Sequence, residues 1–221
     1  MVSAHATVAE QFDTLEQQHE SCVQGMWLFL ATETLFFGAL IFSYVVYRHM
    51  YPAEFQIGSH HLLMPLGAVN TAVLLCSSLT MALAVRSAQT GARGLVAFFL
   101  ILTIVLGFGF LGIKGFEYLT DWREGFVPGS HFTFVSPDPR TIDARKVELF
   151  FLLYFIMTGL HALHMLIGIG LMATLTYRTF RGRYTPEKYT AVELAGLYWH
   201  FVDVVWIFLF PLLYLIGHHS A

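Results

Sequence analysis

The chain has 221 residues, of which 56% are hydrophobic and only 12% are charged, and its formal net charge is −3. Soluble globular domains have about 25% charged residues, so most of the surface of this protein does not face water. The composition excludes an ordinary soluble enzyme and indicates one compact membrane domain. The weak negative charge indicates that nucleic acid is not a partner.

The N-terminal region is polar and acidic. The first 20 residues contain four acidic residues and no lysine or arginine, whereas a secretory signal begins with positive charge followed by an apolar run. We therefore expect residues 1–23 to form a retained polar arm at the membrane surface and residues 24–221 to form the transmembrane domain. Cys22 and Cys76 lack the spacing of a zinc site or a disulfide framework, and we interpret both as small apolar residues.

Five apolar stretches are long enough to span a membrane. A helix needs about 20 mostly apolar residues to cross about 30 Å of hydrocarbon, and each span must be helical because backbone polar groups find no water in lipid. The stretches are residues 25–46, 62–85, 94–119, 147–177 and 192–216. Their continuous apolar character excludes a β-barrel. We predict an all-α integral membrane bundle of five transmembrane helices.

The connections between these stretches are mostly short, and the longest, residues 120–146, contains glycines and prolines that predict a surface loop. With the N-terminus inside, the inner segments have six basic residues and the outer segments five, four of them in the long loop, where the positive-inside rule is weaker. We expect a cytoplasmic N-terminus and an outer C-terminus. The absence of an internal sequence repeat gives no support to the inverted-repeat layout of many transporters.

Glu33 is the most isolated carboxylate of the predicted spans, about nine residues into the first one. Ionisable side chains are costly at this depth and persist only with a partner or a function. Two interpretations are open: a proton-active acid, or a protonated glutamate bonded to Ser, Thr or His on a neighbouring helix. Lys114 and Glu117, three residues apart on the third span, predict an ion pair. Arg123, just beyond them, is a candidate contact for lipid or another subunit.

Histidines raise the possibility of a metal or haem site. His161 and His164 are three residues apart on one predicted helix face, and His200 on the fifth span can join them. A closed site needs further ligands, and the sequence has no EXXH pair of the di-iron type. Bonding between helices is therefore the preferred interpretation, with metal or haem ligation as the alternative.

The fifth span has a polar stripe. Glu193, His200 and Asp203 fall within about 80° of one another at 3.6 residues per turn. This stripe must face other helices or a polar cleft rather than lipid. Trp199 and Trp206, seven residues apart, are candidates for lining a lipid groove or a subunit contact.

The segment YWHFVDVVW (residues 198–206), with Glu193 upstream, resembles the last helix of cytochrome c oxidase subunit III. Three further segments agree in order along the chain. WLFLATETLFFG (residues 27–38) is similar to the family's helix with a buried, carbodiimide-reactive glutamate, at the position of Glu33. Glu117-Tyr118 and TGLHALHMLIG (residues 158–168) are similar to two other family motifs. The resemblance covers about residues 24–217.

The resemblance implies a subunit of a proton-pumping terminal oxidase in a bacterial inner membrane. In this family the chain has no haem or copper of its own; these cofactors are expected in partner subunits. The resemblance implies that the chain stabilises subunit I, contacts subunits II and IV, binds phospholipid and supports proton uptake. The buried polar network would then comprise Glu33, Glu193, His200, Asp203, His161 and His164, with Glu33 the best candidate for a functional acid.

The chain departs from the long form of the family, which has seven helices and encloses phospholipid in a V-shaped cleft. Two N-terminal helices are absent here, so the cleft needs another wall, for which subunits I and IV are candidates. Related five-span proteins occur in quinol oxidases and beside nitric oxide reductases. Glu33 favours the cytochrome c branch, because the quinol branch tends towards Asp. An independent metal or haem protein and a proton-coupled transporter are the alternatives outside the family.

Overall fold

The structure, a computed structural model, describes residues 11–129, 132–134, 142–181 and 189–215. Five long helices make up most of this part of the chain: α1 (Leu15–Met50), α3 (Met64–Gln89), α4 (Arg93–Arg123), α5 (Ala144–Phe180) and α6 (Thr190–Phe210). Each of the five is long and apolar enough to cross a membrane, with the last span continuing to Leu215. The prediction of an all-α membrane bundle is confirmed.

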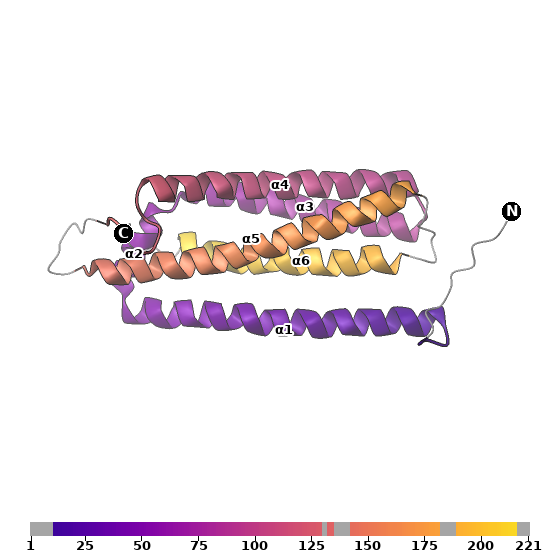
Figure 1. Cartoon of the computed structure of the whole chain (residues 1–221), viewed down its shortest axis with the longest axis horizontal. Helices are drawn as coiled ribbons and strands as arrows, with labels where there is room; N and C mark the ends of the chain where they lie inside the picture. Colours follow the sequence, from indigo (N-terminus) through magenta and orange to yellow (C-terminus); the bar gives the residue numbers. More distant parts are fainter. Residues whose placement is uncertain (1–10, 130–131, 135–141, 182–188, 216–221) are drawn as a thin grey trace.

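The five helices run side by side, with α6 in a central position and α1 at an edge (Figure 1). α6 packs against α3, α5 and α1, whereas α1 packs mainly against α6 and α5 and, to a smaller extent, against the short helix α2. In the most apolar window of each span, 50% of the residues of the last span are buried but only 17% of those of α1. The core of the molecule therefore lies around α6, and α1 is attached to it along one side.

The first helix begins ten residues earlier than the apolar stretch that predicts it. The hydroxyl of Thr14 accepts a hydrogen bond from the N–H of Gln17 at 3.1 Å and caps the N-terminus of α1 at Leu15. Residues 15–23, which belong to the predicted polar arm, form the first turns of this helix. The boundary predicted at residue 24 marks a change of polarity and not a change of structure, while residues 1–10 lie outside the described part.

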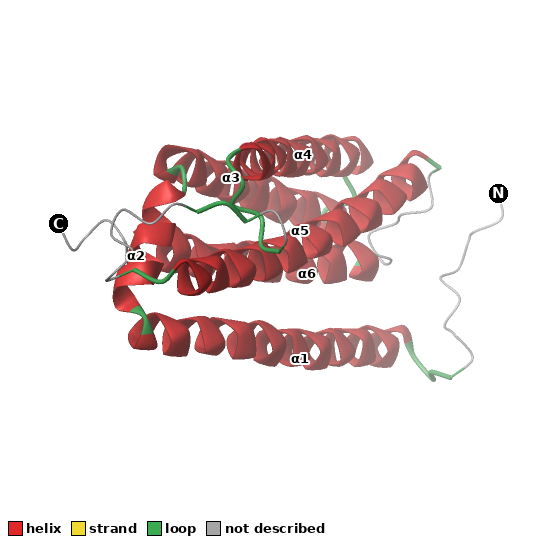
Figure 2. Cartoon of the chain, turned by 60° about the vertical axis from the view of Figure 1, so that its left-hand side comes forward, coloured by secondary structure: helices red, strands yellow, loops and turns green. Residues whose placement is uncertain are grey.

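Two further elements close one end of the bundle. The short helix α2 (Pro52–His61) lies across this end (Figure 2) and buries Phe55 and Ser59. Beside it, α6 gives way to a π-helix, η2 (Pro211–Leu215), where Pro211 has no N–H to continue the α-helical pattern. The carbonyl of Leu212 accepts a bond from Tyr44 Oη at 3.0 Å, and the carbonyl of Leu213 accepts one from Ser59 Oγ at 2.7 Å.

The loop after α4 packs onto the same end of the molecule. Gly125 and Gly129 have positive φ values of 77° and 126°, which allow the chain to turn there. The Phe126 ring stacks on Phe151 with 5.0 Å between centroids, and the Gly129 N–H donates to the Glu148 carboxylate at 2.8 Å. The described part of the predicted 120–146 loop is therefore held by contacts, while residues 130–131 and 135–141 lie outside it.

Candidate functional site

Glu33 on α1 and His164 on α5 form a hydrogen-bonded pair. Glu33 Oε2 lies 3.1 Å from His164 Nε2, and the two side chains are 21% and 12% exposed. His164 Nδ1 lies 2.8 Å from the Leu160 carbonyl, which can only accept, so Nδ1 bears a proton. The Nε2–Oε2 bond then needs one more proton, on the imidazole or on the carboxyl group. The pair has zero net charge in both cases and holds one transferable proton.

Aromatic rings enclose this Glu33–His164 pair where α1, α5 and α6 meet. The Phe37 ring meets the imidazole edge-on at 5.1 Å, and the Tyr198 ring lies parallel to it at 6.4 Å. Tyr198 Oη also donates to the His164 carbonyl at 3.0 Å. These contacts fix the imidazole between α1 and α6, which is a suitable position for transferring a proton to or from Glu33.

An apolar groove of about 610 Å³ lies between α1 and α6, next to this pair. Its walls are nearly all apolar, and their polar members are Thr34 and His200. Thr34 directs its hydroxyl to the backbone carbonyl of Leu30 at 2.8 Å. The lining residues are Trp27, Leu30, Ala31, Thr34, Leu35, Leu197, His200, Phe201 and Val204. Such a surface suits a hydrocarbon chain far better than a polar solute.

His200 connects the wall of the groove to α3. Its Nδ1 lies 2.8 Å from the Ser78 hydroxyl, and the same hydroxyl is near the Asp203 carboxyl group. Asp203 is only 3% exposed, so it faces α3 inside the bundle. Glu193, predicted on the same stripe, points instead to α1, where its Oε2 lies 3.6 Å from His19 Nε2. The predicted stripe is thus divided between two neighbouring helices.

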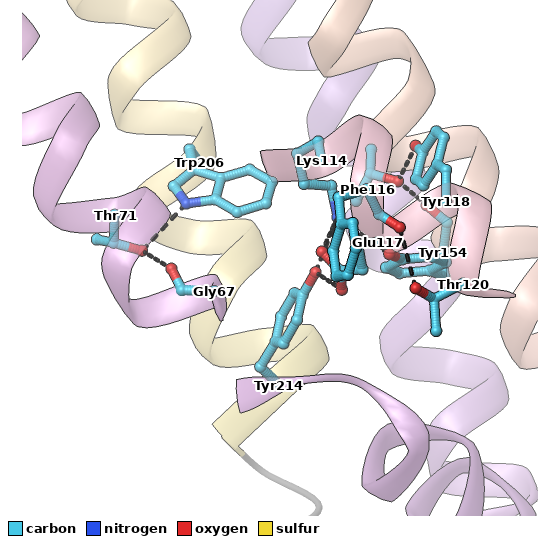
Figure 3. A network of polar contacts seen from close by, with 11 residues as sticks. Gly67, Thr71, Lys114, Phe116, Glu117, Tyr118, Thr120, Tyr154, Trp206 and Tyr214 are labelled. Atoms are coloured by element: carbon cyan, nitrogen blue, oxygen red, sulfur yellow. Dashed lines mark hydrogen bonds and ion pairs between the residues drawn. The ribbon is translucent and has the colours of Figure 1, made fainter. Parts of the chain in front are cut away.

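Lys114 and Glu117 lie at the centre of a second polar cluster (Figure 3). Lys114 Nζ donates to Glu117 Oε2 at 2.9 Å, to Tyr154 Oη at 3.0 Å and to Tyr214 Oη at 2.8 Å. Tyr214 Oη in turn donates to the other Glu117 oxygen at 2.6 Å. The lysine and the glutamate are 3% and 1% exposed, so this ion pair is buried between α4, α5 and η2.

The two tryptophans of α6 are core residues, which makes the expectation of a lipid or subunit contact wrong. Trp199 and Trp206 are both 0% exposed. Their indole N–H groups donate to Ser77 Oγ and Thr71 Oγ1 on α3, each at 3.1 Å. Gly107 on α4 and Gly168 on α5 make room for the Trp199 ring inside the bundle. Arg123 is exposed at the end of α4, and its contact with lipid or a subunit stays a prediction.

The three histidines considered as metal ligands have separate surroundings. His164 faces α1, whereas the His161 ring lies between Phe110 and Trp206, at 5.4 and 5.1 Å from their centroids. His200 faces α3 and the groove. His161 and His164 therefore do not converge on a common ligand position, since one ring lies among aromatic side chains and the other bonds to Glu33. Within the described residues, no three His, Cys, Asp or Glu side chains gather as a metal site.

Several partners in these clusters were missed from the sequence. Ser78, Tyr154 and Tyr214 are ordinary residues of apolar spans, and a single sequence contains no signal that they meet charged groups on other helices. His19 lies outside the stretch that predicts the first span, so its pairing with Glu193 depended on the longer α1. Tyr198 was noted only as the first residue of the segment YWHFVDVVW, and its contact with His164 was not predicted.

The fold and these clusters define a multi-pass membrane protein whose buried polar side chains meet mainly across helix interfaces. A family model, cytochrome c oxidase subunit III, matches residues 145–218. The chain is 31% identical over 217 residues to subunit 3 of the cytochrome bo(3) ubiquinol oxidase of Pseudomonas aeruginosa, covering 98% of this chain and 95% of the relative.

Two further relatives agree with this match. The cytochrome c oxidase subunit 3 of Thermostichus vulcanus is 34% identical over 88% of this chain and 87% of its own. The quinol oxidase subunit 3 of Bacillus subtilis is 28% identical over 96% of this chain and 97% of its own. The chain belongs to the subunit III family of haem–copper oxidases.

Proposed function

We propose that this chain is a non-redox subunit of a proton-pumping terminal oxidase in a bacterial inner membrane. Its role is to stabilise subunit I, to hold phospholipid and to support proton uptake, while haem and copper reside in partner subunits. Subunits II and IV are further neighbours in the proposed complex. The N-terminus faces the cytoplasm and the C-terminus lies outside in this proposal, which follows the basic residues of the connections.

The main support for this role is the Glu33–His164 pair. Its single proton lies between two side chains that are partly exposed on the α1 side of the bundle, and among the residues that the structure describes no third His, Cys, Asp or Glu joins them. The carboxyl group can pass its proton to the imidazole and take it back without leaving an unpaired charge in the membrane, and the pair can release a proton when it takes up another. The groove beside it supports the phospholipid part of the proposal, because its walls match an acyl chain.

The electron donor of the complex is proposed to be cytochrome c, on the basis of Glu33. The matches to both cytochrome c oxidase and quinol oxidase subunits keep quinol as the second candidate. Oxygen consumption by the purified complex with reduced cytochrome c or with a quinol as donor distinguishes the two. Faster turnover with quinol would overturn the cytochrome c assignment and leave the rest of the proposal intact.

Glu33→Gln tests the proton role in the assembled complex. The amide still bonds to His164 but cannot exchange a proton, so we expect the haem spectrum to be unchanged and proton pumping or sustained turnover to fall partially. Glu20→Gln is the matched control, because Glu20 is exposed on the same helix and should change neither quantity. Loss of haem in Glu33→Gln, or an equal response in both variants, would contradict the proposal.

A further inference from the structure

Three polar side chains deep in the bundle have more hydrogen-bonding atoms than partners. Asn70 on α3, His161 on α5 and Asp203 on α6 are 0%, 1% and 3% exposed. Within the described residues, neither amide atom of Asn70 and neither ring nitrogen of His161 has a hydrogen-bond partner. In the same part of the chain, neither Asp203 carboxyl oxygen has a hydrogen-bond partner, and the hydroxyl of nearby Ser78 is also within reach of His200.

The positions of these three side chains can be related to one indole ring, that of Trp206. The His161 ring lies 5.1 Å from Trp206, and the indole N–H donates to Thr71, the neighbour of Asn70 on α3. Asp203 precedes Trp206 by one turn of α6. Because His200 pairs with Ser78 and Trp206 pairs with Thr71, Asp203 is level with the part of α3 between those two residues. The unsatisfied atoms therefore belong to one region between α3, α5 and α6.

Polar atoms in such a region need partners, because neither lipid nor the neighbouring apolar side chains can supply them. Buried water molecules commonly make about three hydrogen bonds to polar groups that the protein leaves unsatisfied. We infer that Asn70, His161 and Asp203 bind internal water around Trp206, and that the α3–α5–α6 interface is hydrated at this level. Ser78 and His200 link this water site to the groove, since His200 also lines the groove.

Hydroxyl-radical footprinting by X-ray radiolysis of the purified complex tests this site, because radicals formed from bound water oxidise the side chains beside it. We expect Phe110 and Trp206 to be oxidised several-fold faster than two controls of the same type. Phe150 is 0% exposed, as is Phe110, but packs against the aromatic rings of Tyr44, Phe55 and Phe151. Trp199 is 0% exposed, as is Trp206, and bonds to Ser77.

Two variants assign the water to the proposed side chains. Asn70→Leu and His161→Phe replace polar groups with apolar groups of similar size, so oxidation of Phe110 and Trp206 should fall towards the level of the controls. Oxidation that persists in both variants would place the water elsewhere and overturn the assignment. If neither variant assembles, the unmodified complex still decides: equal oxidation of Phe110 and Phe150, and of Trp206 and Trp199, refutes internal water here.

Discussion

At the scale of single residues, several ionisable groups in the described helices are paired across helix interfaces or within one helix. Glu33 has His164, Glu193 has His19, and Lys114 has Glu117 together with two tyrosine hydroxyls. Each ion pair or hydrogen bond lowers the cost of placing a polar group where lipid surrounds the bundle. Among them, the Lys114 cluster is the most deeply buried, so its removal should affect stability the most.

Lys114→Met is expected to destabilise the chain by about 3–5 kcal/mol, because it leaves the Glu117 carboxylate buried without its cation. Equilibrium unfolding in mixed micelles with increasing SDS measures this loss. The double variant Lys114→Met/Glu117→Leu removes both charges and should recover part of the loss. Equal loss in the single and double variants would show that the unpaired charge is not the cause.

Lys146→Met is the matched control for this experiment. Lys146 Nζ lies 3.7 Å from Glu54 Oε1, and the Lys146 side chain is 37% exposed although that of Glu54 is only 9% exposed. Because water reaches the lysine, this pairing is screened more than that of Lys114, and we expect a smaller loss of stability than in Lys114→Met.

At the scale of the elements, close helix packing depends on particular glycines. A Cβ atom at Gly168 on α5 would lie 2.8 Å from two ring atoms of Trp199, which has no room to move because it is fully buried and bonded to Ser77. A Cβ atom at Gly170, two residues further along α5, would meet nothing within 4 Å. Gly168 is therefore required for close packing against α6, whereas Gly170 on the same helix is not.

Gly168→Ala is expected to destabilise the bundle by about 1–3 kcal/mol, as overpacking of a core does. Gly170→Ala should change stability by less than about 1 kcal/mol, because alanine only improves helix propensity there. The same SDS titration compares the two variants. An equal loss of stability in both variants would show that the close contact between Gly168 and Trp199 is not the cause.

The sequence predicted the five spans well but not their junctions. Long apolar runs determine the spans because each backbone polar group in lipid must be bonded within its own helix. The start of α1 at Leu15 depends on a cap, and η2 depends on Pro211, so neither follows from hydrophobicity. The short helix α2 has a mixed composition that gives little signal on its own.

The candidate site was only partly predictable for a similar reason. A single sequence indicates which polar residues lie at membrane depth, and Glu33, Lys114, Asp203 and the histidines were identified in this way. Which residue meets which depends on the rotation of each helix about its axis. That rotation separates His161 from His164 and turns Trp199 and Trp206 inward, and it is set by packing against helices far away in the sequence.

At the scale of the whole molecule, α1 is the least integrated part of the transmembrane bundle. Polar contacts join α1 to the other helices at three heights along its length. These contacts are His19 with Glu193, Glu33 with His164, and Tyr44 with the Leu212 carbonyl. The groove lies between α1 and α6 around the second of these contacts, where it is lined on α1 from Trp27 to Leu35. A molecule bound in the groove would therefore contact both α1 and α6 and fill the space between them. The acyl chain of a phospholipid can make such contacts.

Filling the groove with protein should displace that lipid. Ala31 lines the groove on α1, and Ala31→Phe is expected to reduce the number of phospholipids retained by the purified complex, counted by native mass spectrometry. Ala39→Phe is the matched control, because Ala39 is exposed on the same helix but does not line the groove. If phospholipid stabilises the attachment of α1, turnover of the Ala31→Phe complex should also decay faster than that of the control. Unchanged lipid retention in Ala31→Phe would exclude the groove as the lipid site, because a phenyl ring and an acyl chain compete for the same space there.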